Sequence, residues 1–555
     1  MQAIWLKSYP PGVPADITEE AAAYDSLVAI IEESCAAHTS RTAYISMGVT
    51  MSYAELDKQS RHFAAWLQST GVKKGDRVAL MMPNILQYPV CLIGALRAGA
   101  VVVNTNPLYT PNELEHQLAD AGAETIVIAE NFAHTLQKAL PNLKAMQRIV
   151  VTGVGDMLGG LKGLATNLVV RHVKKLVPSW DLPHAISLKQ ALKDGANAGY
   201  TRPILAHEDL ALLQYTGGTT GVAKGAMLTH GNMVSNLCQA YAWVKPHMSE
   251  NECIVTALPL YHIFALTANC LTFLKLGAKN LLIINARDIP DYIKNLRTVP
   301  FTAITGVNTL FNALLNDPNF AKLDFSSLRI TLGGGMAVQE IIAQRWLDLT
   351  GVPIAQAYGL TETSPAVTIN PFENREFTGS IGLPVPSTEI SVRNESNEDL
   401  PQGETGEICV RGPQVTPGYW NAPEETAKAF DKNGFLRTGD IGYVDEQGYL
   451  YLMDRKKDMI LVSGFNVYPN EVEAVAMEHP DVKDVAAVGV PDEKSGEVVK
   501  LFVIRKNDRL TEEELIKHCR TKLTGYKTPK HVEFRQDLPR SNIGKVLRRK
   551  LRDEG

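Results

Sequence analysis

The sequence has few cysteines, and they form no recognisable pattern. Seven cysteines are spread over 555 residues, and no two of them have the CxxC spacing that is typical of zinc and redox sites. An odd number of scattered cysteines argues against a disulfide framework and fits the reducing cytosol. We therefore expect a cytoplasmic protein, and the cysteines indicate no metal site.

Long apolar runs and a large excess of one charge are also missing. The most apolar long stretch, residues 78–103, is interrupted by two prolines and by polar and charged residues, so we expect no segment that spans a bilayer. The first residues, MQAIWLKSYPPG, lack the basic start and apolar core of a signal peptide. A net charge of −5 argues against general nucleic-acid binding. The chain is expected to be soluble or to sit on a membrane surface, without nucleic acid as a partner.

What the sequence does contain is a stretch dense in glycine and threonine, residues 215–225, which reads YTGGTTGVAKG. Three glycines leave the backbone bare so that its N–H groups can approach a polyanion, three threonines add hydroxyl donors, and a lysine adds positive charge. A plain turn needs only one or two permissive residues, so this density favours a phosphate-binding loop. The candidate residues are Thr216, Gly217, Gly218, Thr219, Thr220, Gly221 and Lys224.

This loop departs from the Walker pattern of kinases and GTPases. That pattern ends in GK followed by Ser or Thr, whereas here Ala223 stands at the second glycine and Gly225 at the metal-binding hydroxyl position. Apolar residues 210–213 and 226–228 flank the loop like two strands. The sequence therefore predicts a phosphate-binding loop between two strands, and it disfavours a phosphotransferase.

Helix-like and strand-like segments alternate over most of the chain, which predicts parallel sheet with crossover helices. Short strands and Gly/Pro turns follow from residue 379, and a small α+β unit begins after residues 454–458. The fold class is therefore α/β with a β-rich region and a small C-terminal unit. We expect strands at 77–82, 100–104, 125–129, 254–258, 301–305, 330–332 and 354–357, and helices at 53–67, 87–98, 111–121 and 232–243.

Two loops that follow predicted strands carry groups that suit a nucleotide. The three glycines at 333–335 let a flat ligand approach the backbone. The YGLTET loop, residues 358–363, offers Tyr358 as a stacking face, threonines as phosphate donors and Glu362 as a carboxylate for a hard cation. Because ligands bind beyond the carboxyl ends of strands in such sheets, we expect these loops to contribute to one site.

Two single residues are weaker candidates. His262 follows a predicted strand and suits the mouth of a substrate pocket, although a lone histidine of this kind favours a structural role. Asp440 follows Gly439, where an exposed carboxylate can accept hydrogen bonds from two ribose hydroxyls. A Gly-Asp pair is also common in turns, so both interpretations of Asp440 stay open.

Residues 156–177, DMLGGLKGLATNLVVRHVKKLV, have apolar residues at helical spacing and a basic end. An amphipathic helix of this kind can lie in the interface of a membrane. The alternative is an ordinary surface helix whose C-terminal charges complement the helix dipole, and it is slightly favoured.

Five motifs, in this order, resemble the adenylate-forming superfamily of acyl-CoA synthetases, adenylation domains and luciferases: YTGGTTGVAKG, YGLTET, RTGD, DRKKD and NIGK. The resemblance runs from about residue 53 to residue 552, with Gly217 where many members have serine. The stretches NTNPLYTPNELEHQL, TALPLYHIFAL, FTAITGVNTLFNALL and DRKKDMILVSGFNVYPNEVE further resemble bacterial long-chain fatty acid–CoA ligases.

The resemblance implies a role for each candidate in ATP binding. Residues from Thr216 to Lys224 would hold the β- and γ-phosphates. Thr361 would contact the α-phosphate, Glu362 would ligate Mg²⁺, and Asp440 with Arg455 would hold the ribose. Adenine would be enclosed by Gly333, Gly334, Gly335 and Tyr358, next to Gly359.

The resemblance also implies a large N-terminal domain, residues 1–454, and a small mobile C-terminal domain, residues 455–555. Lys457 would form the hinge between them, and Gly464 would border the pantetheine channel. Lys545 would reach from the small domain to the α-phosphate and to the acyl carboxylate.

The implied reaction is ATP-dependent activation of a long-chain fatty acid to its CoA thioester. The substrates are fatty acid, ATP and CoA, and the cofactor is Mg²⁺. A carboxylate is a poor electrophile, so AMP is attached to it first with release of pyrophosphate, and the CoA thiol then displaces AMP. Attack of one anion on another requires cations, which Mg²⁺ and a lysine supply.

Several alternatives stay open at this point. A medium-chain or aryl acid–CoA ligase, and an enzyme that stops at the acyl-adenylate, belong to the same superfamily. A catalytically silent nucleotide-binding protein is a rival from another class, which Lys545 argues against because binding alone does not require it. A homodimer and a peripheral position on the inner face of the cytoplasmic membrane are both compatible with the sequence.

Overall fold

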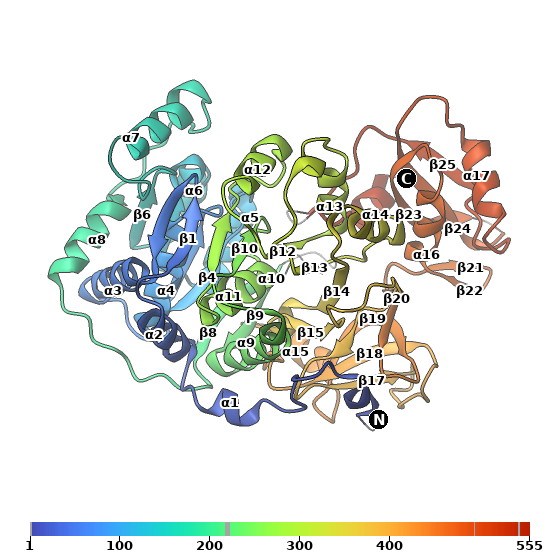
Figure 1. The fold of residues 1–555 in the computed structure, drawn as a ribbon, viewed down its shortest axis with the longest axis horizontal. Helices are drawn as coiled ribbons and strands as arrows, with labels where there is room; N and C mark the ends of the chain where they lie inside the picture. The colour runs from blue at the N-terminus through green and yellow to red at the C-terminus, as the bar shows by residue number, and fades with distance from the viewer. Residues whose placement is uncertain (1–2, 217–222, 493, 542–543, 555) are drawn as a thin grey trace.

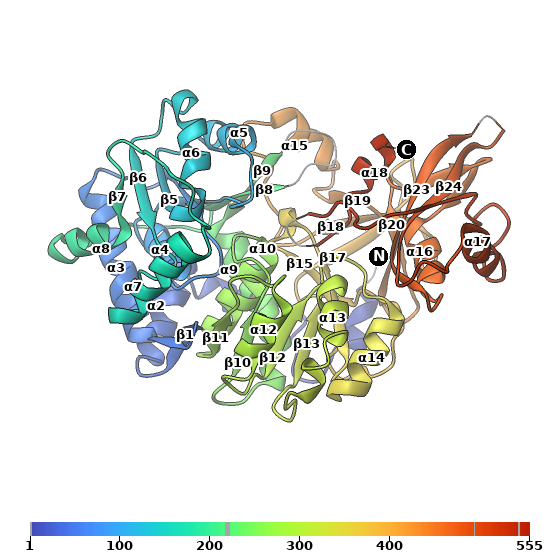
Figure 2. The ribbon, with the colours of Figure 1, turned by 90° about the horizontal axis from the view of Figure 1, so that it is seen from above.

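The computed structural model describes residues 3–216, 223–492, 494–541 and 544–554. Two α/β sheets and a β-rich subdomain form a large N-terminal domain, and a smaller α+β domain follows at the C-terminus (Figure 1). Figure 2 shows the small domain beyond β19 and β20, at the end of the molecule opposite α8. The predicted fold class is confirmed.

The first sheet contains the strands that lead into and out of the predicted phosphate loop. Its order is β7-β6-β5-β3-β4-β8-β9, and all neighbours are parallel except β8 and β9, which form the hairpin around that loop. The strands are β3 (Arg77–Met81), β4 (Val101–Asn104), β5 (Thr125–Ala129), β6 (Arg148–Thr152), β7 (Ile186–Ser187), β8 (Leu210–Thr216) and β9 (Lys224–Thr229).

The second sheet contains the strands that end at the other predicted loops. Its order is β16-β15-β14-β13-β12-β10-β11-β1-β2, parallel from β14 to β1 and antiparallel at both ends. The strands are β1 (Thr42–Ser46), β2 (Val49–Ser52), β10 (Cys253–Thr256), β11 (Lys279–Leu282), β12 (Ala303–Gly306), β13 (Ile330–Gly333), β14 (Ile354–Gly359), β15 (Ala366–Ile369) and β16 (Leu383–Pro384).

Helices cover both faces of these sheets, and local sequence signals set several of their ends. Helix α5 matches its predicted bounds because Thr110 and Glu113 form a capping box, Pro111 occupies the first turn, and Gly122 ends the helix with φ 60°. The α-helices of the large domain are α1 (Thr18–Ala22), α2 (Leu27–Ala37), α3 (Tyr53–Ser69), α4 (Gln87–Arg97), α5 (Pro111–Ala121), α6 (Ala133–Ala139), α7 (Gly160–Leu168), α8 (Leu188–Asn197), α9 (His230–Val244), α10 (Ile263–Ala265), α11 (Thr272–Lys275), α12 (Ile289–Leu296), α13 (Asn308–Leu315), α14 (Glu340–Thr350) and α15 (Pro423–Ala429).

The β-rich subdomain and the small domain contain the short strands and the α+β unit that the sequence predicts. The subdomain is an antiparallel sheet in the order β17-β18-β19-β20, and the small domain has the order β22-β21-β24-β23 with β25 paired to β24. Their elements are β17 (Glu389–Arg393), β18 (Gly406–Arg411), β19 (Leu436–Val444), β20 (Leu450–Arg455), β21 (Ile460–Val462), β22 (Phe465–Val467), α16 (Pro469–Met477), β23 (Val482–Asp492), β24 (Gly496–Arg505), α17 (Glu512–Arg520), β25 (His531–Phe534) and α18 (Arg548–Glu554).

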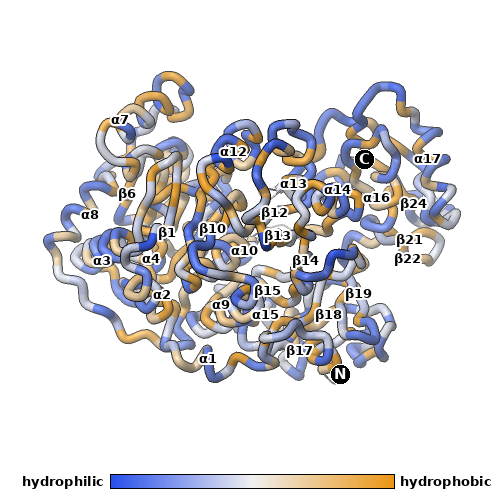
Figure 3. Tube along the Cα trace, viewed as in Figure 1, coloured by the Kyte–Doolittle hydropathy of each residue, from blue (hydrophilic) through white to orange (hydrophobic). Residues whose placement is uncertain are grey.

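The inner strands of the first sheet, such as β4 and β5, are buried on both faces, which explains their nearly continuous apolar sequence. In β3, Val78 and Leu80 belong to the main hydrophobic cluster, whereas Ala79 and Met81 belong to a second cluster on the opposite face. Figure 3 shows hydrophobic stretches along the strands of this interior. Both faces of the sheet are therefore fixed by packing, and the loops at its edge have a rigid base.

Helix α7 projects from the large domain, near α6 and β6 (Figure 1). It continues into a π-helical turn, η4 (Val169–Val173), and together they confirm a helix within residues 156–177. Over the described ranges, no helix combines the length and the apolar character that crossing a membrane requires.

Helix α8 packs so closely on α3 that there is no room for a side chain at Gly195. A Cβ atom at Gly195 would meet the carbonyl oxygen of His62 and would lie 3.1 Å from Cβ of Trp66. We therefore expect Gly195→Ala to lower the free energy of unfolding by about 1–3 kcal/mol, the usual cost of overpacking. The measurement is the midpoint of denaturant or thermal unfolding. The control is Gly199→Ala, where a Cβ atom has no heavy atom within 4 Å; equal midpoints for the two variants would contradict this packing.

Candidate active site

The glycine stretch that begins at the end of β13 lies beside the end of β14, because Gly333 pairs with Gln356 in the sheet. Tyr358 and Gly359, which were predicted to lie in a loop, are the last two residues of β14. A Cβ atom at Gly333 would come within 2.7 Å of Val338, and Gly335 has φ 78°, so this stretch keeps a bare backbone surface. Gly334 lies next to the ring of Phe264, which sequence reasoning did not single out. Gly359 packs against the carbonyl oxygen of Pro365, which excludes a side chain.

Tyr358, Asp440 and Arg455 form one cluster where the second α/β sheet meets the sheet of the β-rich subdomain. The Tyr358 hydroxyl donates to Oδ2 of Asp440 at 2.7 Å, and Nε of Arg455 lies 3.1 Å from Oδ1 of Asp440. Burial and the neighbouring carboxylate raise the pKa of Tyr358, so it remains a donor. Asp440 and Arg455 face each other across β19 and β20.

The expectation of an exposed carboxylate at Asp440 is wrong. Its exposed fraction is 2%, and the hydroxyl of Tyr358 and the guanidinium of Arg455 lie against its two oxygens. Nevertheless, Oδ1 of Asp440 accepts no hydrogen bond of good geometry from the part of the chain that the structure describes. A buried carboxylate oxygen of this kind calls for a donor.

Glu362 and Lys224 lie on different elements, and both contact Tyr419. Glu362 lies in the 3₁₀ turn η8 (Thr361–Thr363), and its Oε1 accepts a hydrogen bond of 2.7 Å from the hydroxyl of Tyr419. Nζ of Lys224 lies 5.6 Å from the centre of the same tyrosine ring and forms an ion pair with Glu425. Tyr419 and Glu425 had no sequence signal that separated them from ordinary turn and helix residues.

The ends of the phosphate loop are fixed by the hairpin, since Thr216 pairs with Lys224 across β8 and β9. The predicted residues Gly217, Gly218, Thr219, Thr220 and Gly221 lie outside the described residues. Thr361 is half-buried in η8, one residue before Glu362.

No cluster of three or more His, Cys, Asp or Glu side chains that could hold a metal ion occurs among the described residues. A lone Glu362 still fits Mg²⁺, because this ion keeps several waters and is bound through one or two carboxylates together with substrate phosphates. Oε2 of Glu362 accepts no hydrogen bond from any described residue, so an oxygen remains for such a ligand.

Lys545 comes to this site from the small domain. Its loop is closed by Ser541, whose N–H donates to the carbonyl of Lys545 at 2.7 Å, and Gly544 packs against Thr309 at the start of α13. Burial, together with the positive charge of Arg455, lowers the pKa of Lys545 to about 8. Lys545 therefore lies in the electrostatic field of the Asp440–Arg455 pair, although these residues are about a hundred positions away in sequence.

The remaining predicted residues lie apart from this cluster or have structural roles. Gly464 forms the exposed turn between β21 and β22 with φ 84°, and no heavy atom lies near its Cβ position. Lys457 is exposed, and its carbonyl oxygen accepts a hydrogen bond of 3.4 Å from Arg552. His262 caps α10 by accepting from the N–H of Phe264 at 3.3 Å, and burial lowers its pKa to about 4, so it is neutral.

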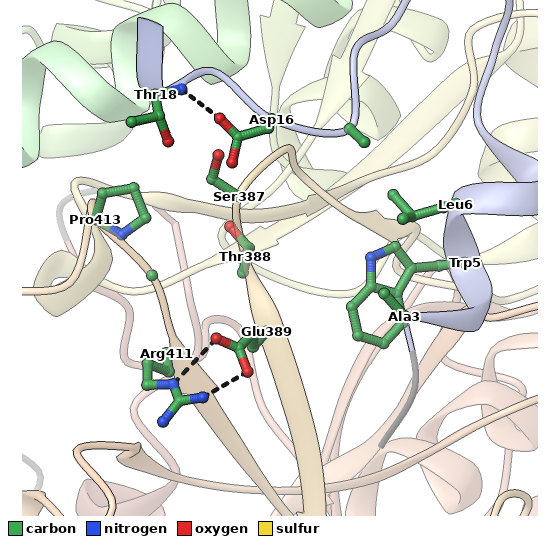
Figure 4. A pocket seen from close by; sticks show the side chains of 12 residues that line it. Ala3, Trp5, Leu6, Asp16, Thr18, Ser387, Thr388, Glu389, Arg411 and Pro413 are labelled. Atoms are coloured by element: carbon green, nitrogen blue, oxygen red, sulfur yellow. Dashed lines mark hydrogen bonds and ion pairs between the residues drawn. The ribbon is translucent and has the colours of Figure 1, made fainter. Parts of the chain in front are cut away.

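Two surface cavities differ in their relation to this site. One of about 510 Å³ lies between the N-terminal segment and β17 and is lined by Trp5, Asp16 and Arg411, among others (Figure 4). It contains none of the predicted residues. The other, of about 540 Å³, contains none of the predicted residues either, but it is lined by Tyr419, which contacts both Glu362 and Lys224, and by Trp420 and residues of α15.

Comparisons with known proteins show the family of this chain. The AMP-binding enzyme family matches residues 31–420, and the C-terminal domain of AMP-binding enzymes matches residues 471–545. A long-chain-fatty-acid–CoA ligase of Escherichia coli O6:H1 is 57% identical over 556 residues, which cover 100% of this chain and 98% of the relative. The corresponding ligase of Haemophilus influenzae is 50% identical, with coverages of 100% and 99%.

Solved structures of related enzymes share the fold of this chain. An anthranilate CoA ligase in complex with anthranoyl-AMP superposes with a TM-score of 0.85 at 25% identity, and the match covers 96% of this chain and 98% of that one. The family matches span most of the chain and contain the Tyr358 loop, Glu362, Lys224 and Lys545. The chain belongs to the AMP-binding enzyme family.

Proposed function

We propose that this protein is an ATP-dependent long-chain fatty acid–CoA ligase that works through an acyl-adenylate and releases pyrophosphate and AMP. The observation that carries the proposal is the position of Lys545: its neighbour Gly544 lies against Thr309 of the large domain, and the charges of Arg455 and Asp440 act on its ammonium group. The substrate class is supported by relatives of the same length, named long-chain-fatty-acid–CoA ligases, at 50–57% identity.

In this proposal the glycines at 333–335 and Tyr358 enclose adenine, and Asp440 with Arg455 hold the ribose. Thr216 and Lys224 bind the terminal phosphates, and Thr361 contacts the α-phosphate. Glu362 would hold Mg²⁺, which when bound neutralises phosphate charge. Lys545 donates positive charge to the α-phosphate and the acyl carboxylate as they approach each other, so that attack of one anion on another becomes feasible.

We also propose that the domains divide at residues 454 and 455 and that Lys457 is the hinge. Lys545 lies near Asp440 and Arg455, whereas Gly464 is exposed on a separate turn of the small domain. Rotation about Lys457 would withdraw Lys545 and bring the turn at Gly464 to the acyl group for attack by CoA. One active site would then perform both steps with two faces of the same domain.

Lys545→Ala should lower fatty-acid-dependent pyrophosphate release by roughly 10²-fold or more, because a positioned charge is lost from a sheltered site. The same variant, given preformed acyl-adenylate and CoA, should form thioester at nearly the normal rate. The control Lys550→Ala removes an exposed lysine of α18 and should leave both steps unchanged. Conversely, Gly464→Leu should spare adenylation and block thioester formation.

The matched control for Gly464→Leu is Gly434→Leu. Gly434 also has positive φ, 78°, and no heavy atom near its Cβ position, so the two substitutions impose similar backbone strain. Only the change at Gly464 should affect the second step. If Lys545→Ala and Gly464→Leu slowed both steps equally, the two-orientation mechanism would be wrong.

The pKa of Lys545 predicts the pH dependence of the first step. Because this pKa is lowered to about 8, the ammonium loses its proton as the pH rises through 8, and the charge needed for adenylation is lost above that pH. We expect kcat/KM for pyrophosphate release, which reports the free enzyme, to decline with a midpoint near 8. Lys545→Arg should move this decline to higher pH, since guanidinium stays charged; an identical profile in that variant would assign the decline to another group.

Substrate choice is tested by AMP release with saturated acids of increasing chain length, with and without CoA. Long acids should give the highest kcat/KM, and a preference for medium-chain or aryl acids would overturn the assignment of substrate class. AMP release that does not respond to CoA would indicate an enzyme that stops at the acyl-adenylate.

We further propose that residues 156–177 attach the protein to an anionic membrane surface. Helix α7 packs on the protein with its small and polar side: Gly163 contacts the carbonyl of Gly155, and Asn167 accepts from the N–H of Gly155 at 2.7 Å. Its apolar side faces outward, with Leu161 exposed by 85% and Leu164 by 64%. An ordinary surface helix has the opposite orientation.

The exposed apolar side continues beyond α7, and basic residues lie next to it. Leu168, Val173 and Leu176 are exposed, as are the neighbouring Lys174 and Lys175. Apolar groups can enter the headgroup region while lysines contact anionic lipid. This combination favours the membrane interpretation, which on sequence alone was the weaker of the two.

Leu161→Glu combined with Leu168→Glu should reduce co-sedimentation with anionic liposomes several-fold, because two exposed apolar groups become charged. Activity on detergent-solubilised fatty acid should stay normal, since neither side chain contacts the candidate site. Leu108→Glu is the control, because Leu108 is exposed by 60% on a different part of the surface. Unchanged sedimentation of the double variant would leave α7 an ordinary surface helix.

A further inference from the structure

The segment that carries Tyr419 is attached to β9 of the phosphate hairpin by one antiparallel bridge, between Tyr419 and Ala226. The N–H of Met227 donates to the carbonyl of Gly418 at 3.0 Å, and the N–H of Trp420 donates to the carbonyl of Gly225 at 2.8 Å. The N–H of Tyr419 donates to Oγ1 of Thr426 at 2.9 Å, which fixes the start of α15. The backbone of Tyr419 is therefore held on both sides, close to the lysine that ends the phosphate loop.

The hydroxyl of Tyr419 is directed at Glu362, the carboxylate proposed to hold Mg²⁺. The hydrogen bond to Oε1 is 2.7 Å long, and the N–H of Thr416 donates to the backbone carbonyl of Glu362 at 2.8 Å. A carboxylate oxygen can only accept, so the Tyr419 phenol is the donor in this hydrogen bond. Oε1 is occupied in this way, and Oε2 is left for a cation.

The ring of Tyr419 is directed at Lys224. Nζ lies 5.6 Å from the ring centre, a separation at which a cation is attracted to the face of an aromatic ring. On the same side, Glu425 of α15 forms the ion pair with Lys224. The ammonium is therefore held over the ring, next to an anion, at the end of the loop that would receive phosphate.

We infer that Tyr419 is a positioning residue for the first half-reaction. Its hydroxyl orients Glu362 toward the metal, and its ring orients Lys224 toward the terminal phosphates. One side chain thereby sets the distance between the two groups that bind the same metal–phosphate unit. The inference deepens the proposed function and rests on it. The two halves of the side chain have separable effects, and this makes the role testable.

Tyr419→Phe removes the hydroxyl and keeps the ring. Loss of a partner that orients a metal ligand typically costs 10- to 100-fold in metal affinity or activity. We expect the gain in ATP affinity on adding Mg²⁺, measured by calorimetry, to fall about tenfold. ATP binding without Mg²⁺ should stay unchanged, because Lys224 keeps its position over the ring. A merely structural role would change both affinities or neither.

Tyr419→Leu removes the ring as well. It should weaken ATP binding in the absence of Mg²⁺ several-fold, in addition to the loss seen with Tyr419→Phe. Both variants should form thioester normally from preformed acyl-adenylate and CoA, which also shows that they are folded. Tyr292→Phe is the control, because this buried tyrosine hydroxyl has no hydrogen-bond partner within the described ranges.

The outcomes separate this inference from the proposed function. If the unmodified protein released no pyrophosphate with any fatty acid, the proposed function would fail. If it did so, and Tyr419→Phe bound ATP with the same Mg²⁺ dependence as Tyr292→Phe, the inference alone would be overturned. Equal losses in both half-reactions would also overturn it, because they would indicate a general structural defect.

Discussion

The carboxylate of Asp440 is almost completely removed from water, and a buried charge must be compensated by its neighbours. The compensating groups come from separate parts of the fold: Tyr358 from the end of β14, Arg455 from the end of β20, and the field of Lys545 from the small domain. The sheets therefore have to meet at one point, and that point is the candidate site. Breaking one partner would leave the carboxylate uncompensated, so the same interactions that shape the site also hold the subdomains together.

A second group of buried charges lies where the small domain begins. Nη1 of Arg548 lies 3.2 Å from Oδ1 of Asp454, and its Nη2 donates to Glu473 at 2.9 Å. The N–H of Asn470 donates to the other oxygen of Asp454 at 2.9 Å. Asp454 therefore binds the small domain although it lies before the proposed hinge at Lys457. A rotation about Lys457 would have to break these contacts, whereas a pivot before Asp454 would move Asp454 together with the small domain and keep them. The free energy needed for the rotation therefore depends on where the pivot lies.

The parts of this structure that the sequence predicts are those set by local interactions. The bounds of α5 follow from Thr110, Glu113 and Pro111, which lie within four residues of one another. The loop of Glu362 was found because its residue types are adjacent in sequence. By contrast, the partners of these residues are distant: Tyr419 is 57 residues from Glu362, and Glu425 is 201 residues from Lys224. Neither pair leaves a periodic or motif signal, and the burial of Asp440 likewise depends on Tyr358, 82 residues earlier.

The positive groups of the site lack sufficient negative partners, and an anionic ligand would stabilise their charges. Lys545 is partly desolvated and lies near Arg455, and both effects disfavour its positive charge, which is why its pKa falls to about 8. Asp440 offsets only part of this cost, because Tyr358 and Arg455 already occupy its surroundings. Lys224, at the other end of the site, has an anion only because Glu425 supplies one. A polyphosphate would give each of these ammonium groups a negative partner without any change in the protein's own charge. Binding of a polyphosphate would therefore offset the repulsion between the positive groups of the site. This offset would be largest where the reacting phosphate carries the most negative charge.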